Sequence, residues 1–255
     1  MDNQALYTEF MKLYSPSRVK DYTVPARKPE EIPAFDGQDA EQLRNIAMHV
    51  DEQRLRDSNI GMQMAGQDLL ENLIRWLSQD GRVHAESLMA VIGAMGGHEL
   101  QRAIMQTLGR FEDKQIWEVL GILIAETKTG EKNLFGDFAG NEFSGFYMTA
   151  AQSSESPVEK LKPISSACAS AAGTEKYWET PFNKQIGISP KGIVDIFDHK
   201  FDKMFATFTR FPHERPMAYA FAAMAAIKKV ENVLKKEDAL TILAEYGWRT
   251  SHYIC

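Results

Sequence analysis

Apolar residues recur at helical spacing near the start of the chain. Leu6, Phe10 and Leu13 form one stripe within residues 2–14, and Pro16 follows directly. Prolines at positions 16, 25, 29 and 33, mixed with charged residues, interrupt any regular pattern between residues 15 and 37. The pattern predicts a short helix followed by a proline-rich arm.

A longer helical pattern covers residues 39–79 and weakens at "RDSNIGMQ", residues 56–63. Leu69, Leu73 and Trp76 belong to a wide apolar stripe late in this region. We expect helix here, with a break in the middle. Gly81 is a suitable stop signal, because glycine readily adopts the left-handed conformation at a helix end.

The segment "GAMGGHEL", residues 93–100, allows two interpretations. Glycines between a strand and a helix can form a phosphate-binding turn, whereas glycines within one helix let a second backbone approach closely. Leu88, Ile92 and Met95 share one helix face, and the stripe continues to residue 108. The segment also departs from GxGxxG and lacks the Lys-Ser/Thr pair of a P-loop. We therefore predict one continuous helix over residues 83–108, closely packed at its glycines.

One β element is expected, at residues 119–136. An apolar run over 119–125 is followed by "KTGEK" and by a second short run over 133–135, the pattern of a hairpin. A lone hairpin is marginal in water, so it must pack on the helices. The next stretch, "GDFAGNEFSGF" (residues 136–146), is rich in glycine and phenylalanine and predicts an ordered loop.

Four more helices are expected, over residues 156–172, 192–209, 216–234 and 236–248. The third is rich in alanine on nearly every side, which favours a central position. The predicted fold class is mainly α, a compact multi-helix bundle with one small β-hairpin packed on it. Two parts are expected: an N-terminal helix and proline-rich arm over residues 1–37, and a single helical domain over 38–255.

Composition narrows the classes of function. The formal net charge of −6 does not favour binding to the negatively charged phosphate backbone, so nucleic acid is not expected as a partner. The longest apolar stretch, residues 218–227, is too short to span a membrane, and no membrane partner is expected. Only two cysteines are present, Cys168 and Cys255, which fits a reducing cytoplasm. No cofactor is predicted.

Three segments in order suggest a family: "DGRVHAESLMAVIGAMGGHELQ", "AETKTGEKNLFGD" and "DALTILAEYGW". Their arrangement resembles that of a family of bacterial, mostly helical proteins with no assigned function. The resemblance covers roughly residues 75–250 and implies a bacterial, cytoplasmic, helical protein. It implies no activity.

The segment "DIFDHKFD" contains the sharpest cluster of chemistry-bearing side chains. Asp195, Asp198, His199 and Asp202 would share one face of a continuous helix, where carboxylates and an imidazole can hold a divalent cation. The alternative is that they form the solvated back of a helix whose phenylalanines are buried, and we favour it.

The segment "RFPHERP" places Arg210, His213 and Arg215 between two helices. These side chains could contact an anion or a protein partner. The favoured alternative is that they cap the adjacent helices.

The absence of a recognised catalytic motif, together with several small-residue helices, predicts a non-catalytic cytoplasmic protein. It would bind another protein or a second copy of itself. One alternative is a metal-binding protein or enzyme that uses the acidic cluster. Another is a helical small-molecule sensor with a pocket lined by aromatics such as Phe143, Phe146 and Tyr147.

Overall fold

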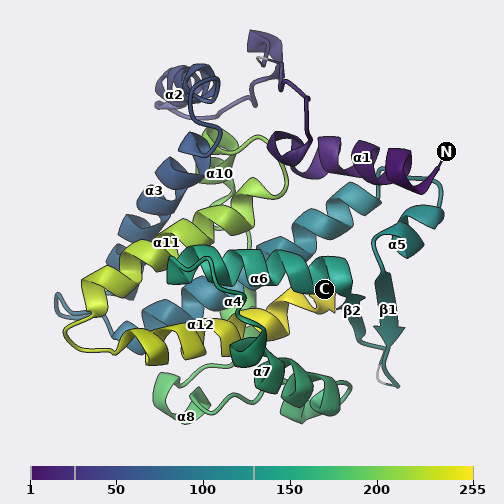
Figure 1. Ribbon diagram of the computed structural model, residues 1–255. Coiled ribbons are helices and arrows are strands. Elements are labelled where there is room, and N and C mark those ends of the chain that lie inside the picture. Colours follow the sequence, from purple (N-terminus) through teal and green to yellow (C-terminus); the bar gives the residue numbers. More distant parts are fainter. Residues whose placement is uncertain (1, 26, 129, 255) are drawn as a thin grey trace.

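The computed structural model describes residues 2–25, 27–128 and 130–254, most of them in helices (Figure 1). Met1, Ala26, Thr129 of the predicted turn and Cys255 lie outside the described residues. The α-helices are α1 (Asn3–Tyr14), α2 (Ala40–Gln53), α3 (Ile60–Leu77), α4 (Ala85–Leu108), α5 (Gln115–Val119), α6 (Asp137–Ala151), α7 (Val158–Ala171), α8 (Asn183–Ile186), α9 (Pro190–Phe197), α10 (Asp202–Phe208), α11 (Glu214–Val230) and α12 (Lys236–Ser251). The short 3-10 helices are η1 (Pro16–Arg18), η2 (Pro29–Glu31) and η3 (Glu175–Trp178). The strands are β1 (Ile122–Glu126), β2 (Lys132–Gly136) and β3 (Tyr253–Ile254). The predicted fold class, mainly α with a small β element, is confirmed.

Helix α4 runs through the middle of the molecule, and most of its 24 residues are buried (Figure 1). It packs most extensively on α12 and next on α11, and α11 also lies on α3 and α6. The alanine-rich face of α11 is fully buried, as at Ala218, Ala222 and Ala226, which confirms its predicted central position. These helices share one contiguous apolar core.

Residues 85–108 form a single helix, so the predicted continuous helix is confirmed and a strand–turn–helix at the glycines is ruled out. Gly93 and Gly97 face α12, whereas Gly96 faces Phe146 of α6 and Tyr219 of α11. A Cβ atom added to Gly93 would come within 2.5 Å of the Leu243 carbonyl oxygen, closer than real Cβ atoms approach. Missing side chains therefore let the two backbones pack against each other.

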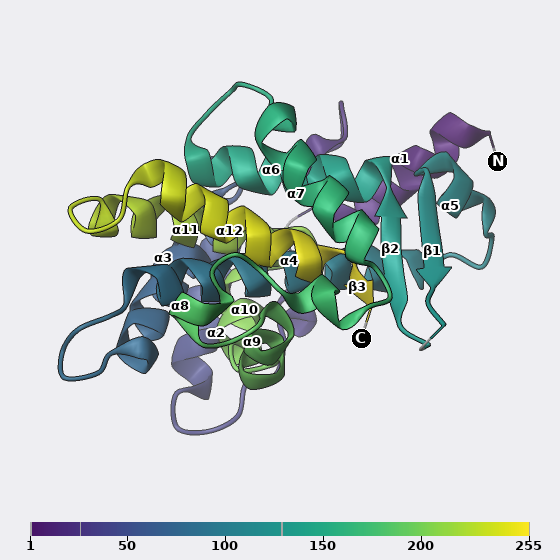
Figure 2. The same ribbon diagram turned by 90° about the horizontal axis from the view of Figure 1, so that it is seen from below.

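The predicted hairpin is confirmed, and it has a third strand that was not predicted. β1 and β2 pair antiparallel with Leu123 opposite Phe135, and β2 pairs with β3 with Asn133 opposite Tyr253. Figure 2 shows β3 directly following the end of α12. The last residues of the described chain thus connect the sheet to the central helices. Val119, the first residue of the predicted hairpin, instead ends helix α5, and β1 begins at Ile122.

The prediction of a loop over residues 136–146 is wrong, because this stretch belongs to α6. Phe138, Phe143 and Phe146 are buried on one side of that helix. Burial of this stripe outweighs the poor helix propensity of the two glycines inside it.

A single helix over residues 192–209 is also wrong, because the chain leaves the helix at Asp198 and re-enters it at Asp202. The Asp198 carboxylate accepts a hydrogen bond from the His199 backbone N–H (3.0 Å), a local bond that competes with helix continuation. His199 has φ 62°, a left-handed conformation that few non-glycine residues adopt. The four predicted metal ligands therefore do not share one helix face.

Helix α1 packs into the main core, although it was predicted as part of the arm over residues 1–37. The Phe10 ring lies edge-on to that of Phe138, with centroids 5.3 Å apart. The rest of the arm is held by polar contacts: Arg27 binds Asp51 (2.5 Å), and Arg210 donates to the Pro25 carbonyl oxygen (2.7 Å). Within the part of the chain that the structure describes, no helix combines the length and the apolar character needed to cross a membrane.

Candidate functional site

The break between α9 and α10 places Asp198 and Asp202 against two arginines of the central helices. Arg102 of α4 donates to Asp198 Oδ1 (3.0 Å), and Arg215 of α11 donates to Asp202 Oδ1 (2.9 Å). The His199 ring lies between the two carboxylates, with Nε2 at 3.1 Å from Asp198 Oδ2 and Nδ1 at 2.9 Å from Asp202 Oδ2. The acidic residues are thus neutralised by guanidinium groups.

Glu99 is the buried member of this cluster, with only 4% of its surface exposed. Its carboxylate binds Arg102 (3.0 Å) and lies 3.8 Å from Arg215. Burial raises the pKa of Glu99, although both arginines oppose the shift. For Asp202 the balance is reversed: burial favours the neutral acid, but the His199 hydrogen bond and the arginine charges outweigh it and lower the pKa. We call Glu99, Arg102, Asp198, His199, Asp202 and Arg215 the charged network.

The charged network does not form a metal centre. Among the residues that the structure describes, no three His, Cys, Asp or Glu side chains are arranged to hold a metal ion. Asp198 and Asp202 point their oxygens at arginines, whose positive charge disfavours a cation. Asp195, the fourth predicted ligand, lies elsewhere, at the wall of a pocket.

This pocket, of about 280 Å³, lies beside the charged network, where α4, α9, α12, η3 and β3 meet. We call it the His98 pocket. Figure 2 shows α9 below the α4 and α12 pair, with β3 next to them. The residues that line it are His98, Trp178, Lys191, Val194, Asp195, Thr250 and Tyr253.

The aromatic wall of the pocket is fixed by contacts between η3 and the end of α12. Trp178 and Tyr253 meet edge to face, with centroids 4.7 Å apart. Behind them, the Tyr177 hydroxyl donates to the Arg249 carbonyl oxygen (2.8 Å), and Arg249 Nε donates to the Tyr177 carbonyl oxygen (2.7 Å). These reciprocal hydrogen bonds hold the two walls together.

His98 connects the pocket to the charged network. Only 4% of this residue is exposed, and its buried Nε2 atom lies 3.3 Å from Asp198 Oδ1. Burial lowers the pKa of His98 more than the Asp198 carboxylate raises it. The imidazole is therefore mainly neutral at pH 7, so one ring nitrogen can donate and the other can accept.

Two opposite charges occupy the α9 wall, four residues apart. Lys191 and Asp195 are both exposed, and neither has an ion-pair partner within the described parts of the chain. The Lys191 ammonium lies 5.6 Å from the centre of the Tyr253 ring. The mouth of the pocket thus carries one cation, over the Tyr253 ring, and one carboxylate, and neither charge is in an ion pair within the described residues.

The three residues of the predicted anion or partner contact go to three different places. Arg210 binds the arm, Arg215 joins the charged network, and the His213 Nδ1 atom lies 2.8 Å from the Tyr14 carbonyl oxygen. Each contacts a different segment of the protein, and His213, at the N-cap of α11, makes no side-chain capping hydrogen bond, so neither a joint site nor the favoured helix capping is seen for these side chains.

The predicted aromatic pocket is not formed by the residues expected for it. Phe143 and Phe146 are fully buried and Tyr147 is 5% exposed. Phe146 covers Gly96, and Phe143 meets Trp248 edge to face at 5.2 Å. These rings fill the core.

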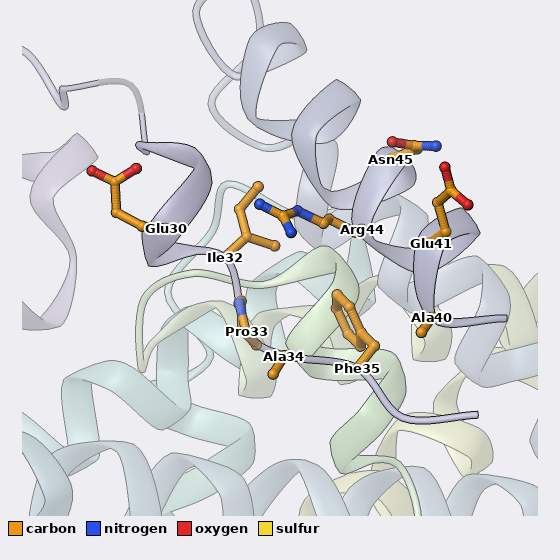
Figure 3. A pocket seen from close by; sticks show the side chains of 9 residues that line it. All are labelled: Glu30, Ile32, Pro33, Ala34, Phe35, Ala40, Glu41, Arg44 and Asn45. Atoms are coloured by element: carbon orange, nitrogen blue, oxygen red, sulfur yellow. The ribbon is translucent and has the colours of Figure 1, made fainter. Parts of the chain in front are cut away.

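A larger hollow of about 650 Å³ lies between the arm and α2 (Figure 3). Ile32, Pro33 and Phe35 of the arm form one side, and Arg44 of α2 points toward Ile32. It contains none of the residues singled out from the sequence, and its walls are one helix and an irregular segment. The His98 pocket, walled by five elements, is the better-defined site.

Sequence patterns identified Asp195 of this pocket but missed the rest of its polar wall. His98 stands directly after the glycines of α4, which places it at the closest approach of α4 and α12. Its position next to these glycines was the one feature of the sequence that could have pointed to His98. Trp178, Lys191 and Tyr253 come from three distant segments, and only the tertiary fold brings them together.

Comparison with family models, curated proteins and solved structures gives no match. The resemblance to a family of bacterial helical proteins stays a prediction. The site is therefore interpreted from its own residues.

Proposed function

We propose that this protein binds a small molecule in the His98 pocket. The observation that carries the proposal is a pocket whose lining combines a buried, neutral imidazole, with Asp198 Oδ1 3.3 Å from its Nε2 atom, and the aromatic rings of Trp178 and Tyr253. A buried titratable group at the wall of a pocket, with its pKa shifted by burial and by a specific charged partner, is a common mark of a functional site.

The shape and lining support a ligand of metabolite size. The volume of about 280 Å³ lies just below the roughly 300 to 1,000 Å³ typical of sites for drug-sized ligands. Trp178, Val194 and Tyr253 supply apolar surface, whereas His98 and Thr250 supply polar groups. Ligand sites combine these features, with the apolar walls contributing affinity and the polar groups fixing orientation.

The charged network acts behind the pocket as a support. Asp198 Oδ1, at the end of α9, lies 3.3 Å from His98 Nε2 and accepts a hydrogen bond from Arg102 of α4, so Arg102 helps to fix the carboxylate that contacts the imidazole. We infer a binding role, because the lining combines apolar walls with a small number of polar groups.

Saturation-transfer NMR with indole and indole-3-propionate tests the proposal. These probes match the aromatic wall, and the second adds a carboxylate. We expect transfer to both with the unaltered protein and loss of transfer in Val194→Phe, which fills the pocket. Leu123→Phe, on a strand residue that is 63% exposed, is the matched control and keeps the signal.

A second variant guards against misfolding of Val194→Phe. Trp178→Ala removes the opposite wall, where the side chain is half-buried, and should weaken binding while the melting curve stays cooperative. Transfer that is equal in all four proteins would place binding elsewhere and overturn the proposal.

The cytoplasm is the location that we infer for this binding role. Cys168 is a buried free thiol, which fits a reducing compartment. The expected protein partner or self-association stays a prediction, tested by the oligomeric state in light scattering.

A further inference from the structure

The two free charges at the mouth of the His98 pocket indicate the class of ligand. Lys191 and Asp195 lie one helical turn apart on α9, and both line the pocket. Side chains four residues apart on a helix are neighbours, with roughly 5 to 6 Å between their Cβ atoms. No ion pair joins these two residues in the described parts of the chain, so both charges are open to a ligand.

We infer that the ligand is a small zwitterion with an aromatic side chain, of the amino-acid type. This inference rests on the proposed function and adds to it the ligand's charge pattern. The carboxylate of the ligand pairs with the Lys191 ammonium, and its ammonium group pairs with the Asp195 carboxylate. In an α-amino acid both groups are bonded to one carbon, which suits two charges on neighbouring helix positions.

The aromatic wall accounts for the remainder of the ligand. Trp178 and Tyr253 lie edge to face, and a flat ligand ring can pack against such aromatic side chains in an offset or edge-to-face arrangement. Val194, which is 6% exposed, lines the pocket on the same helix as the two charges. Charge recognition at the mouth and ring packing inside are thus supplied by different residues.

A cation or an anion alone would leave one of the two charges unmatched. A purely anionic ligand brings its carboxylate close to Asp195 as well as to Lys191, and a purely cationic ligand has the reverse problem. Neutral aromatic molecules gain only the ring contacts. The zwitterion is the ligand that pairs both groups.

Binding titrations with three matched molecules test this inference: L-tryptophan, indole-3-propionate and tryptamine. They share the indole ring and differ in whether they carry both charges, the carboxylate only or the ammonium only. We expect L-tryptophan to bind about two- to fivefold more tightly than either analogue, the value of one exposed ion pair.

Two neutral variants assign the charges. Lys191→Gln should remove the preference for L-tryptophan over tryptamine and leave its preference over indole-3-propionate. Asp195→Asn should do the opposite. Lys162→Gln, a charge removal at an exposed position of α7, is the control and should leave all three affinities unchanged.

The outcomes separate this inference from the proposed function. If the singly charged probes bind in a Val194-dependent way and L-tryptophan binds no more tightly, the zwitterion is wrong while the pocket stands. If none of the three molecules binds, the proposed function fails and the inference falls with it.

Discussion

Gly97 of α4 and Gly247 of α12 lie so close that a Cβ atom on Gly97 would stand 2.1 Å from the Gly247 carbonyl oxygen. The same added Cβ atom would lie 2.4 Å from Thr250 Oγ1. The Thr250 hydroxyl donates a hydrogen bond to the Ala94 carbonyl oxygen (2.7 Å). Thr250 also lines the His98 pocket. The close approach of these two helices therefore sets the geometry of the site.

We predict that Gly97→Ala lowers the free energy of unfolding by at least about 1 to 3 kcal/mol, the usual cost of overpacking. The added methyl group meets backbone atoms, which cannot move aside as a flexible side chain can. Urea denaturation followed by circular dichroism measures the change.

Gly140→Ala is the matched control, because nothing lies within 4 Å of a Cβ atom at this position of α6. Alanine is the better helix former, so this variant should be unchanged or more stable by up to about 1 kcal/mol. Equal stability of the two variants would contradict close packing at Gly97.

Removal of the Arg102 charge should leave the buried carboxylate of Glu99 without its nearest ion-pair partner. Arg102→Met leaves that group with Arg215 alone, at 3.8 Å, and we expect a loss of about 3 kcal/mol at pH 7. Burial already raises the Glu99 pKa, and loss of Arg102 raises it further. The folded variant then binds a proton more readily, so the loss should be smaller at pH 5 than at pH 7.

Addition of Glu99→Gln to Arg102→Met tests that explanation. The double variant carries no buried unpaired carboxylate and should recover part of the stability at pH 7. If it is as unstable as Arg102→Met at every pH, the charge on Glu99 is not the cause.

His252 should make stability depend on pH. Burial lowers its pKa from 6.5 to about 4, although the Trp248 carbonyl oxygen favours the protonated form. The unfolded chain binds a proton below pH 6.5 and the folded chain does so only near pH 4, so stability rises as the pH rises from 4 to 6.5.

Chemical denaturation of the protein and of His252→Gln across this pH range isolates the effect, since other titrating groups are common to both. The free energy of unfolding should rise with pH more steeply for the unaltered protein than for His252→Gln. The difference in slope should correspond to at most one bound proton. Parallel pH profiles would show that His252 does not titrate as its burial requires.

Cys168 should resist thiol reagents in the folded protein. It is 2% exposed, and burial raises the pKa of its thiol to about 11, so little thiolate forms at pH 8. A Cys255→Ser variant leaves Cys168 as the only thiol. It should react with Ellman's reagent in guanidinium chloride and remain unmodified when folded; rapid stoichiometric modification of the folded variant would contradict this.

Local patterns predicted much of the helical framework. The apolar stripe from Leu88 to Leu108 and the glycines within it lie in one continuous segment, so both could be recognised from the sequence alone. Two predictions of local structure failed, the first because of tertiary burial and the second because of a local hydrogen bond. Residues 136–146 became helix because their phenylalanines are buried, and the helix predicted over 192–209 breaks where Asp198 bonds the His199 N–H group.

Most of the candidate site could not be predicted from the sequence, because tertiary contacts bring its residues together. Asp198 and Asp202 were recognised as chemically notable, but their arginine partners lie on α4 and α11. Arg102 carries no local motif, and Trp178 and Tyr253 are far apart along the chain. Contacts between residues on different helices leave no pattern in the spacing of residues along the sequence.

The central claim is that a small molecule occupies the His98 pocket. Intermolecular nuclear Overhauser effects between indole-3-propionate and the methyl-labelled protein test it most directly. We predict effects from the indole protons to the Val194 methyl groups, which line this pocket. Effects confined to Leu70, in the separate groove between α3 and α11, or the absence of any effect at a saturating probe concentration, would contradict the claim.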